Sequence, residues 1–331
     1  MIITRTPFRI SFAGGGTDLR TFYSKEPGKV ISTSIDKYIY VVIKRQIGIV
    51  EHKYRVNWSK VEFKDTIDEI EHPIVREALR IFKIDFPIEI STFTDIPGQT
   101  GLGSSSAFAV GLVNALHALK GEMVTKSTIA ATAAKIEVDI LGRSMGKQDH
   151  YASAYGNLNV FIFNEDETVT VEPVLYRQEV KNFIEGNLQL FYLKSKRDAS
   201  KILEIQEQNT SKIFKNLSEL KSLVNPLTEI FSSGLDINNF GELLHQGWMI
   251  KKGLTDVISS SIIDKYYQKA IDSGAIGGKI LGAGGGGFLL LYVEKENQQS
   301  VIDSLSNLFH LNVCFDQSGT RITYYDQSII G

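Results

Sequence analysis

The chain has 331 residues, of which 43% are hydrophobic, and its net charge at pH 7 is −2. This length suffices for two domains with buried cores, and the composition is that of a folded protein rather than a disordered one. The near-neutral charge argues against a protein that coats nucleic acid. Because Cys314 is the sole cysteine, no internal disulfide can form, which favours a reducing cytoplasm.

The apolar segments do not predict a membrane protein. The N-terminus carries Arg5 and Arg9 within its apolar stretch and so lacks the core of a signal peptide. The most hydrophobic window, 102–119, contains serines, Asn114 and His117, which argue against a membrane span. We therefore expect a cytoplasmic monomer or homodimer that acts on a small molecule, with neither a membrane nor a nucleic acid as partner.

The first part of the chain interleaves strands and helices without a regular βαβ repeat. A strand is expected at 2–12, followed by a turn at Gly14 to Gly16. The next expected elements are strands at 30–35, 38–44 and 54–57, a helix at 74–82, a strand at 88–93, helices at 105–119 and 126–141, and strands at 159–163 and 169–172.

The sequence pattern changes near residue 185, where we place a domain boundary. A strand at 188–193 leads into a long helical region that reaches about residue 223. The expected elements that follow are a helix at 262–273, a glycine-rich loop at 282–287, a strand at 288–293, a helix and two strands. We therefore expect an α+β protein with domains at 1–185 and 186–331.

One segment, Pro97 to Leu119, contains no Asp, Glu, Lys or Arg, although these residues make up 22% of the chain. It begins as a glycine-rich loop, continues through a serine triplet at 104–106 and ends as an apolar helix. The N-terminus of such a helix presents unpaired N–H groups and a partial positive charge. The segment therefore predicts a phosphate site that needs no basic side chain.

Two glycine patterns resemble nucleotide motifs but fail in context. Gly98 and Gly103 have the spacing of a Walker A loop, yet Ser104 stands where that loop requires lysine. Gly282 to Gly287 fits G-x-G-x-x-G, but a strand follows it, whereas a dinucleotide site has a strand before and a helix after. By itself the second pattern predicts a tight turn between a helix and a strand.

Two carboxylates differ from ordinary surface charges. Glu137 lies on a helical stripe of small and apolar residues and has no basic residue four positions away. Asp139, in contrast, has Lys135 and Arg143 at that spacing and can pair with them. A buried carboxylate needs a cation, either a metal ion or an arginine or lysine from elsewhere in the chain. Asp149 follows this helix beside Lys147, and it either caps the next helical turn or acts as a base in the same cleft.

Three segments resemble the ordered motifs of the GHMP small-molecule kinases: TPFRISFAGGGTDL at 6–19, PGQTGLGSSSAF at 97–108 and GGKILGAGGGGFLLL at 277–291. With IEVDILGRSMGKQD between the second and third, the resemblance spans most of the chain. The first motif and GKQDHYASAYGN are most similar to sugar 1-kinases that convert D-glycero-D-manno-heptose 7-phosphate to the 1,7-bisphosphate. GGGTD differs from the Gly-Glu-His-Thr-Asp of galactokinases, which counts against galactose.

The resemblance implies a fold and a set of roles. It implies an N-terminal ATP-binding domain like ribosomal protein S5 domain 2, a ferredoxin-like C-terminal domain and a site in the cleft between them. Asp149 would take the proton of the anomeric hydroxyl, Arg9 would face that aspartate, and Ser105 and Glu137 would hold Mg²⁺. The residues implied to bind ATP are Pro97, Gly98, Gly101, Leu102, Gly103, Ser104, Ser105 and Ser106.

The resemblance also implies sugar contacts from Gly15, Gly16, Asp18, Gly284 and Gly285, although Asp18 can also serve as a turn residue. A phosphorylated substrate needs a distal cation. Lys194, Lys196 and Arg197 follow a strand, and Arg197 is the favoured candidate, with Lys251 and Lys252 as further ones. His150 is expected to pack near Asp149 rather than to act as a base.

Three other functions remain open from the sequence. A GHMP kinase for a fucose-like or galactose-like sugar would share these motifs. A catalytically silent sugar-sensing relative would have no need for Asp149, Arg9 and Glu137. A dinucleotide-dependent oxidoreductase is disfavoured by the order of strand and glycines around Gly282.

Overall fold

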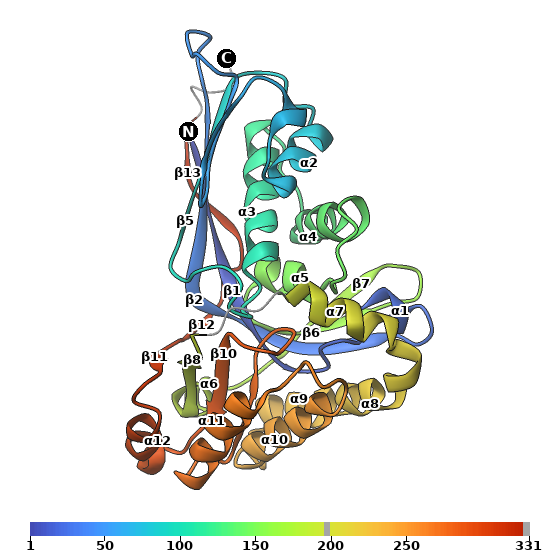
Figure 1. The fold of residues 1–331 in the computed structure, drawn as a ribbon, viewed down its shortest axis with the longest axis vertical. Coiled ribbons are helices and arrows are strands. Elements are labelled where there is room, and N and C mark those ends of the chain that lie inside the picture. The colour runs from blue at the N-terminus through green and yellow to red at the C-terminus, as the bar shows by residue number, and fades with distance from the viewer. Residues whose placement is uncertain (195–198, 327–331) are drawn as a thin grey trace.

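The computed structural model describes residues 1–194 and 199–326 and arranges them around two β-sheets (Figure 1). Arg197 and Lys196, two of the predicted phosphate-binding candidates, lie outside the described residues. In the described part of the chain, no helix is both long and apolar enough to cross a membrane.

Within residues 1–194 and 199–326, the first sheet has nine strands, with the long β2 at its centre. β2 runs unbroken over Gly28–Arg45, where the sequence predicted two strands. Both halves of β2 pair with β1: Thr6 lies opposite Ile39, and Arg9 lies opposite Ser34. The register of this pairing shifts between Pro7 and Arg9, near the position where the sequence predicted a break between two strands. The other strands are β1 Ile2–Ala13, β3 Tyr54–Asn57, β4 Val61–Lys64, β5 Ile88–Thr94, β6 Leu158–Phe163, β7 Val169–Pro173, β12 Phe315–Asp316 and β13 Arg321–Tyr325.

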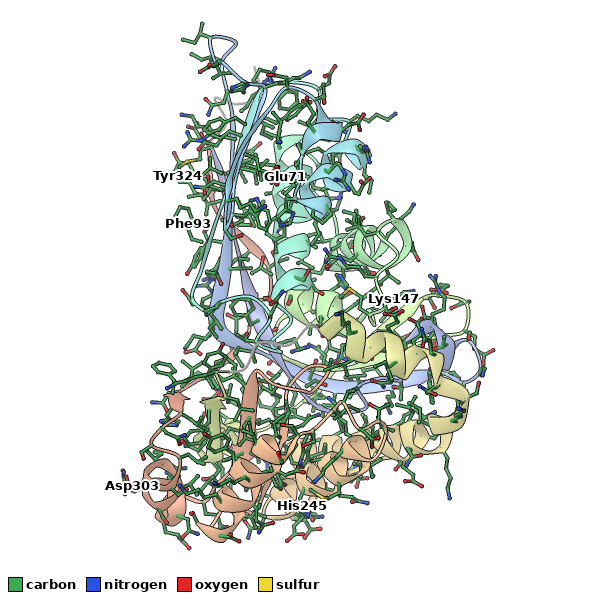
Figure 2. All side chains as sticks on the ribbon, viewed as in Figure 1. Glu71, Phe93, Lys147, His245, Asp303 and Tyr324 are labelled. Atoms are coloured by element: carbon green, nitrogen blue, oxygen red, sulfur yellow. The ribbon has the colours of Figure 1, made fainter. Side chains whose placement is uncertain are left out.

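Helices cover one face of this sheet, and the opposite face exposes side chains such as Phe93 and Tyr324 (Figure 2). α3, Ser104–Leu119, packs directly on β1 and β2. Gly111 allows this approach, because a Cβ there would lie 2.9 Å from Thr6 Oγ1. The accompanying helices are η1 Ile67–Glu69, α1 Arg20–Tyr23, α2 Pro73–Ile81, α4 Lys126–Ala134 and α5 Gln148–Tyr155.

The helix predicted at 126–141 changes its winding after Ala134. α4 ends there, and η2, Lys135–Ile140, continues as a π-helix. The wider turn shifts every following side chain relative to the 3.6-residue spacing, and π-helical turns often occur at functional sites. Glu137 lies in this turn and is fully buried.

The second sheet has four strands in the order β11, β8, β10 and β9. The long helical region expected after β8 is divided at Asn209 into α7 and α8. The strands are β8 Leu188–Tyr192, β9 Gly277–Ile280, β10 Phe288–Tyr292 and β11 Phe309–Leu311. The helices are α6 Gln178–Asn187, α7 Ala199–Gln208, α8 Thr210–Ser222, α9 Val224–Ser233, α10 Asn239–Lys252, α11 Ser261–Asp272, η3 Lys295–Asn297 and α12 Gln298–Ser304.

The chain crosses between the sheets more than once. The second sheet begins at Leu188, close to the expected boundary at residue 185, but β12 and β13 return to pair with β2 and β1. An aromatic cluster joins the two parts, with the ring of Phe12 5.3 Å from Phe240 and 6.2 Å from Phe315 between centroids. The two sheets therefore share a hydrophobic core.

Candidate active site

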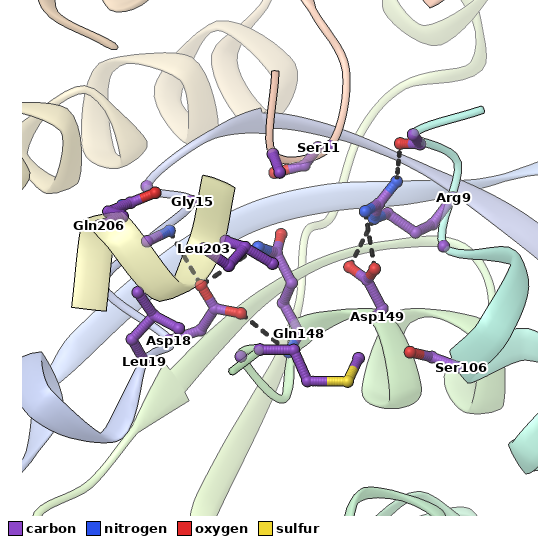
Figure 3. Close-up of a pocket in the computed structure, with 18 of the residues that line it drawn as sticks. Arg9, Ser11, Gly15, Asp18, Leu19, Ser106, Gln148, Asp149, Leu203 and Gln206 are labelled. Atoms are coloured by element: carbon purple, nitrogen blue, oxygen red, sulfur yellow. Dashed lines mark hydrogen bonds and ion pairs between the residues drawn. The ribbon is translucent and has the colours of Figure 1, made fainter. Parts of the chain in front are cut away.

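A cavity of about 400 Å³ lies where β1, α3, η2, α5 and the loop before β10 meet (Figure 3). Its lining includes residues from each of the segments singled out in the sequence: Arg9, Asp18, Gly103, Glu137, Asp149 and Gly282. Folding therefore brings together side chains that are up to about 270 positions apart in the chain.

Arg9 and Asp149 form a two-point ion pair in this cavity. Arg9 Nε donates to Asp149 Oδ1 and Nη2 donates to Oδ2, each at 2.7 Å. The remaining nitrogen, Nη1, donates to the Gly101 carbonyl oxygen at 2.7 Å. Such fork-to-fork geometry holds a carboxylate in one orientation. Asp149 lies in the first turn of α5 and is held against the glycine loop rather than free in solvent.

The N-terminus of α3 faces the same cavity. Gly103 begins the helix with a φ of 77°, and no side chain caps the free N–H groups of its first turn. Ser104, Ser105 and Ser106 all line the cavity, and the buried Ser106 Oγ has no hydrogen-bond partner among the described residues. These unpaired donors match what an anionic phosphate requires.

The glycine loop before α3 contacts the third sequence motif. A Cβ on Gly101 would lie 2.5 Å from the Leu281 carbonyl oxygen, so only glycine allows this contact. Leu102 is buried beneath the loop, where its carbonyl oxygen accepts the Arg9 N–H at 3.1 Å. Pro97 and Gly98 are exposed, and they are not among the described residues that line the cavity.

Glu137 has three partners among the described residues, and one of them, Arg143, is the basic partner that the sequence left open as an alternative to a metal ion. Arg143, six positions away, forms an ion pair with it, and Ser105 Oγ donates to the same oxygen. His150 Nε2 lies 2.9 Å from the other oxygen and packs there as expected. Burial alone would raise the pKa of Glu137, but the His150 and Ser105 hydrogen bonds and the Arg143 charge together lower it. Asp139 pairs with Arg20 at the surface instead of with Arg143.

These contacts fit an oxygen-ligated cation. Ser105 Oγ and Glu137 Oε1 are hydrogen-bonded to each other and both line the cavity, so they offer two oxygen ligands of the kind that Mg²⁺ takes. In this structure the Arg143 guanidinium lies against Glu137 Oε1, the oxygen that a metal ion would bind. Among the described residues, no three His, Cys, Asp or Glu side chains gather to hold a metal, so phosphate and water would have to complete the shell.

Asp18 lines the cavity on the side opposite to Asp149 (Figure 3). Its Oδ1 accepts the Gly16 N–H at 2.9 Å, which is the turn contact considered from the sequence, and its Oδ2 accepts the Gln148 N–H at 3.2 Å. Burial raises the pKa of Asp18, and the charge of Asp149 adds to the rise, against these backbone hydrogen bonds. Gly15 and Gly16 line the cavity beside it.

Two buried lysines complete the site. Lys251 donates to the Gly282 carbonyl oxygen, and burial together with the Arg9 charge lowers its pKa to about 8. Lys279 donates to the Phe12 carbonyl oxygen at 2.9 Å, and burial lowers its pKa well below the ordinary value. Sequence reasoning named Lys251 but missed Lys279, whose signal was a lone cation in the apolar strand GGKIL. Lys252 is outside the cavity lining and pairs with Asp264.

Gly284 and Gly285 lie apart from the predicted sugar site. A Cβ on Gly284 would lie 2.9 Å from the Ile258 carbonyl oxygen, and the Gly285 N–H donates to that oxygen at 2.8 Å. Within the described part of the chain, the cavity lining from this loop is Gly282 and Ala283. The loop's tight turn against Ile258 places the two predicted glycines behind the lining.

Comparisons with known proteins match both halves of the chain. The family model described as GHMP kinases N terminal domain matches residues 73–157, and the one described as GHMP kinases C terminal matches residues 226–311. A D-glycero-alpha-D-manno-heptose 7-phosphate kinase from Campylobacter jejuni is 28% identical over 92% of this chain and 93% of its own length. A galactokinase from Pyrococcus furiosus is 23% identical over 92% of each chain.

Solved structures share the whole fold. The crystal structure of a D-glycero-D-manno-heptose 1-phosphate kinase from Bacteriodes thetaiotaomicron aligns with a TM-score of 0.80 and 21% identity, and covers 99% of this chain and 100% of that one. The Lactococcus lactis galactokinase in complex with galactose aligns with a TM-score of 0.77 and 16% identity, over 97% of this chain and 94% of that one. At these identities the structural likeness establishes the fold alone.

Proposed function

Because this chain belongs to the GHMP kinases, we propose that it is an ATP-dependent sugar 1-kinase whose substrate is D-glycero-D-manno-heptose 7-phosphate and whose product is the 1,7-bisphosphate. The similarity to the Campylobacter jejuni heptose 7-phosphate kinase extends over nearly the full length of both chains and supports this choice of sugar. We further propose that it acts in the cytoplasm as a monomer or homodimer.

The observation that carries this proposal is the arrangement of Arg9, Asp149 and the α3 N-terminus around one cavity. A phosphoryl donor needs a phosphate site, and the acceptor hydroxyl needs a fixed base beside it. The first turn of α3, which no side chain caps, is the proposed phosphate site. The Asp149 carboxylate, held by Arg9, is the proposed base.

In the proposed reaction, the anomeric oxygen of the sugar forms a bond to the γ-phosphorus of ATP. The bond from that phosphorus to the β,γ-bridging oxygen breaks, and ADP leaves with the electron pair. Asp149 accepts the hydroxyl proton on a carboxylate oxygen. Arg9 keeps that carboxylate facing the cavity and adds positive charge next to the transferred group.

The ATP phosphates are proposed to lie on the backbone of Gly101, Gly103 and Ser104 to Ser106, with Pro97, Gly98 and Leu102 shaping the loop. Ser105 and Glu137 would hold Mg²⁺, which would supply positive charge to offset the charge of the phosphates. The Arg143 guanidinium must then move away from Glu137. Its side chain is 30% exposed and therefore has room to do so.

For the sugar we propose contacts from Asp18, Gly15 and Gly16. A substrate that already carries a phosphate needs a distal cation. Of the described candidates, Lys251 lies in the cavity lining, whereas Lys252 is paired elsewhere. Arg197 stays a prediction from the sequence.

ADP release with Mg-ATP and a panel of acceptors tests the proposal. D-glycero-D-manno-heptose 7-phosphate should be turned over, whereas the unphosphorylated heptose, fucose, galactose and mevalonate should not. The product should show a phosphorus nucleus coupled to the anomeric proton in its NMR spectrum. Turnover of fucose or galactose, but not of the heptose phosphate, would support a sugar kinase and refute the proposed substrate. No ADP release with any acceptor, together with tight ATP binding, would favour a silent relative.

A further inference from the structure

Besides Ser106 Oγ, two polar atoms in the cavity wall have no hydrogen-bond partner among the described residues. Ser11 is 6% exposed, and its Oγ makes no hydrogen bond to any described residue. The side-chain oxygen of Gln148, Oε1, is likewise buried and unpaired. Both residues line the cavity. A buried polar atom without a partner is costly, so a group that is absent from the free protein is expected to satisfy it.

Both side chains converge on Gly15. A Cβ built on Gly15 would lie 3.5 Å from Gln148 Nε2 and 3.9 Å from Ser11 Oγ, and these are the two nearest atoms recorded within 4 Å. The remaining space beside Gly15 is open to the cavity. One bound ligand can therefore reach both groups.

Asp18 fixes which end of the Gln148 amide faces the cavity. The two carboxylate oxygens of Asp18 accept the backbone N–H groups of Gly16 and Gln148. Oδ1 also accepts from Gln148 Nε2 at 3.2 Å (Figure 3). This bond fixes the orientation of the amide: Nε2 uses one of its two N–H groups on Asp18, and Oε1 is an acceptor that needs a donor.

The backbone requires glycine at positions 14 and 16 but not at position 15. Gly14 and Gly16 have φ values of 85° and 98°, which side chains rarely adopt, and a Cβ on Gly14 would overlap the Lys29 carbonyl oxygen. Gly15 has no such φ, and a Cβ there would make only ordinary contacts. Alanine would therefore fit at position 15 in the free protein. Its methyl group would occupy space that a ligand can fill.

We propose that Ser11 and Gln148 form a hydroxyl-binding subsite that determines which sugars this site accepts. One sugar hydroxyl donates to Gln148 Oε1, and a neighbouring hydroxyl pairs with Ser11 Oγ. The Asp18 carboxylate and Gln148 Oε1 are both acceptors, so this subsite favours a hydroxyl, which can donate, over a phosphate. The polyol part of the substrate therefore lies here, and its phosphate lies at another part of the cavity. This inference rests on the proposed sugar kinase function.

The test compares Ser11→Ala, Gln148→Met and Gly15→Ala with two matched controls, Ser153→Ala and Gln189→Met. Ser153 and Gln189 also carry buried unpaired polar atoms, but neither lines the cavity. The first two variants should raise the KM for the sugar about 10-fold each, the scale of one neutral hydrogen bond. Gly15→Ala should raise it at least as much. The affinity for ATP, measured by calorimetry, should not change in any variant.

Deoxy sugars separate recognition from a structural role. A sugar that lacks the hydroxyl bound by Gln148 should lose about 10-fold in kcat/KM with the unmodified protein and lose nothing further with Gln148→Met. If Ser11→Ala and Gln148→Met stay within twofold of the unmodified protein for every sugar, the subsite is refuted. The same holds if the two controls shift the sugar KM equally.

Failure of the proposed function gives a different result. If the protein turns over no sugar, sugar binding is measured by calorimetry in the presence of a non-hydrolysable ATP analogue. Weakened sugar binding by Gly15→Ala in that experiment would support the subsite although the kinase proposal had failed. Absence of any sugar binding by the unmodified protein would overturn both.

Discussion

Arg9 joins Asp149 to the glycine-rich loop before α3, since two of its nitrogens bind the carboxylate and the third binds the Gly101 carbonyl oxygen. One guanidinium thus links β1, α5 and the segment that leads into α3. Because this guanidinium is almost fully buried, any change in the Gly101 loop is transmitted to the proposed base.

Asp149→Asn should abolish most phosphoryl transfer while leaving nucleotide binding intact. Asparagine keeps the shape but cannot accept the hydroxyl proton, so we expect kcat to fall by about 10²-fold or more. ADP release measures kcat, and calorimetry with an ATP analogue measures binding. A variant that retains more than a tenth of the activity would show that Asp149 only positions neighbouring groups.

Glu137→Gln should raise the Mg²⁺ concentration required for half-maximal activity. The substitution removes the charge next to Ser105, and since even outer-shell partners of metal ligands contribute about 10- to 100-fold in affinity, we expect a rise of about 10-fold or more. A magnesium titration of initial rates measures it. Asp139→Asn, on the same η2 turn but paired with Arg20 at the surface, is the matched control. If the unmodified protein, Glu137→Gln and Asp139→Asn required the same Mg²⁺ concentration, Glu137 would not be a metal ligand.

Lys251→Met should stabilise the fold near neutral pH. The pKa of Lys251 is lowered from 10.5 to about 8, so its charged form penalises the folded state by roughly 3 kcal/mol. The penalty is complete below pH 8, where both states are protonated, and it disappears as the pH rises toward 10.5 because the unfolded state then loses the same proton. The unfolding free energies of both proteins, from urea denaturation at pH 7 and pH 10, should therefore differ most at pH 7. If the difference in unfolding free energy grew from pH 7 to pH 10, the result would contradict a buried, charged Lys251 in the folded protein. Activity should fall in the same variant, since Lys251 lines the cavity.

Gly101→Ala should cost more stability than Gly121→Ala. Both glycines have positive φ values, 83° and 70°, so both substitutions carry backbone strain. A Cβ on Gly101 would also meet the Leu281 carbonyl oxygen, whereas a Cβ on Gly121 would meet nothing within 4 Å. We expect an additional loss of about 1 to 3 kcal/mol for Gly101→Ala, the usual cost of overpacking. Thermal unfolding of both variants measures it, and equal losses would show that the loop can move away from Leu281.

The sequence alone indicated that the N-terminus of α3 is uncapped and lines the cavity. A long segment without charges, with glycines and serines before an apolar helix, has few structural solutions, because an apolar helix must be buried and its first turn must expose N–H groups. The same local reasoning identified Glu137 as buried. These predictions depend on the order of residues within one element, so they need no knowledge of distant neighbours.

The partners of Glu137 could not be predicted in this way. Regular 3.6-residue spacing placed Arg143 beside Asp139, but the π-helical turn at Lys135–Ile140 and the end of the helix redirect Arg143 to Glu137. The 3.6-residue pattern contains no information about such a change of winding. The position of Gly284 and Gly285 outside the cavity lining could not be predicted either, since it depends on the turn of that loop against Ile258.

The order of residues along the chain thus determined the family motifs, most of the helices and strands, and the glycine-rich loop with the exposed helix N-terminus that follows it. Tertiary structure decided the rest. It returned β12 and β13 to the first sheet, placed Lys251 and Lys279 in the same cavity lining as Arg9 and Asp149, and left Ser11 Oγ and Gln148 Oε1 without a partner among the described residues. Local structure follows from periodicity and short-range hydrogen bonds, whereas these contacts join residues far apart in the chain and arise only from the packing of the two sheets.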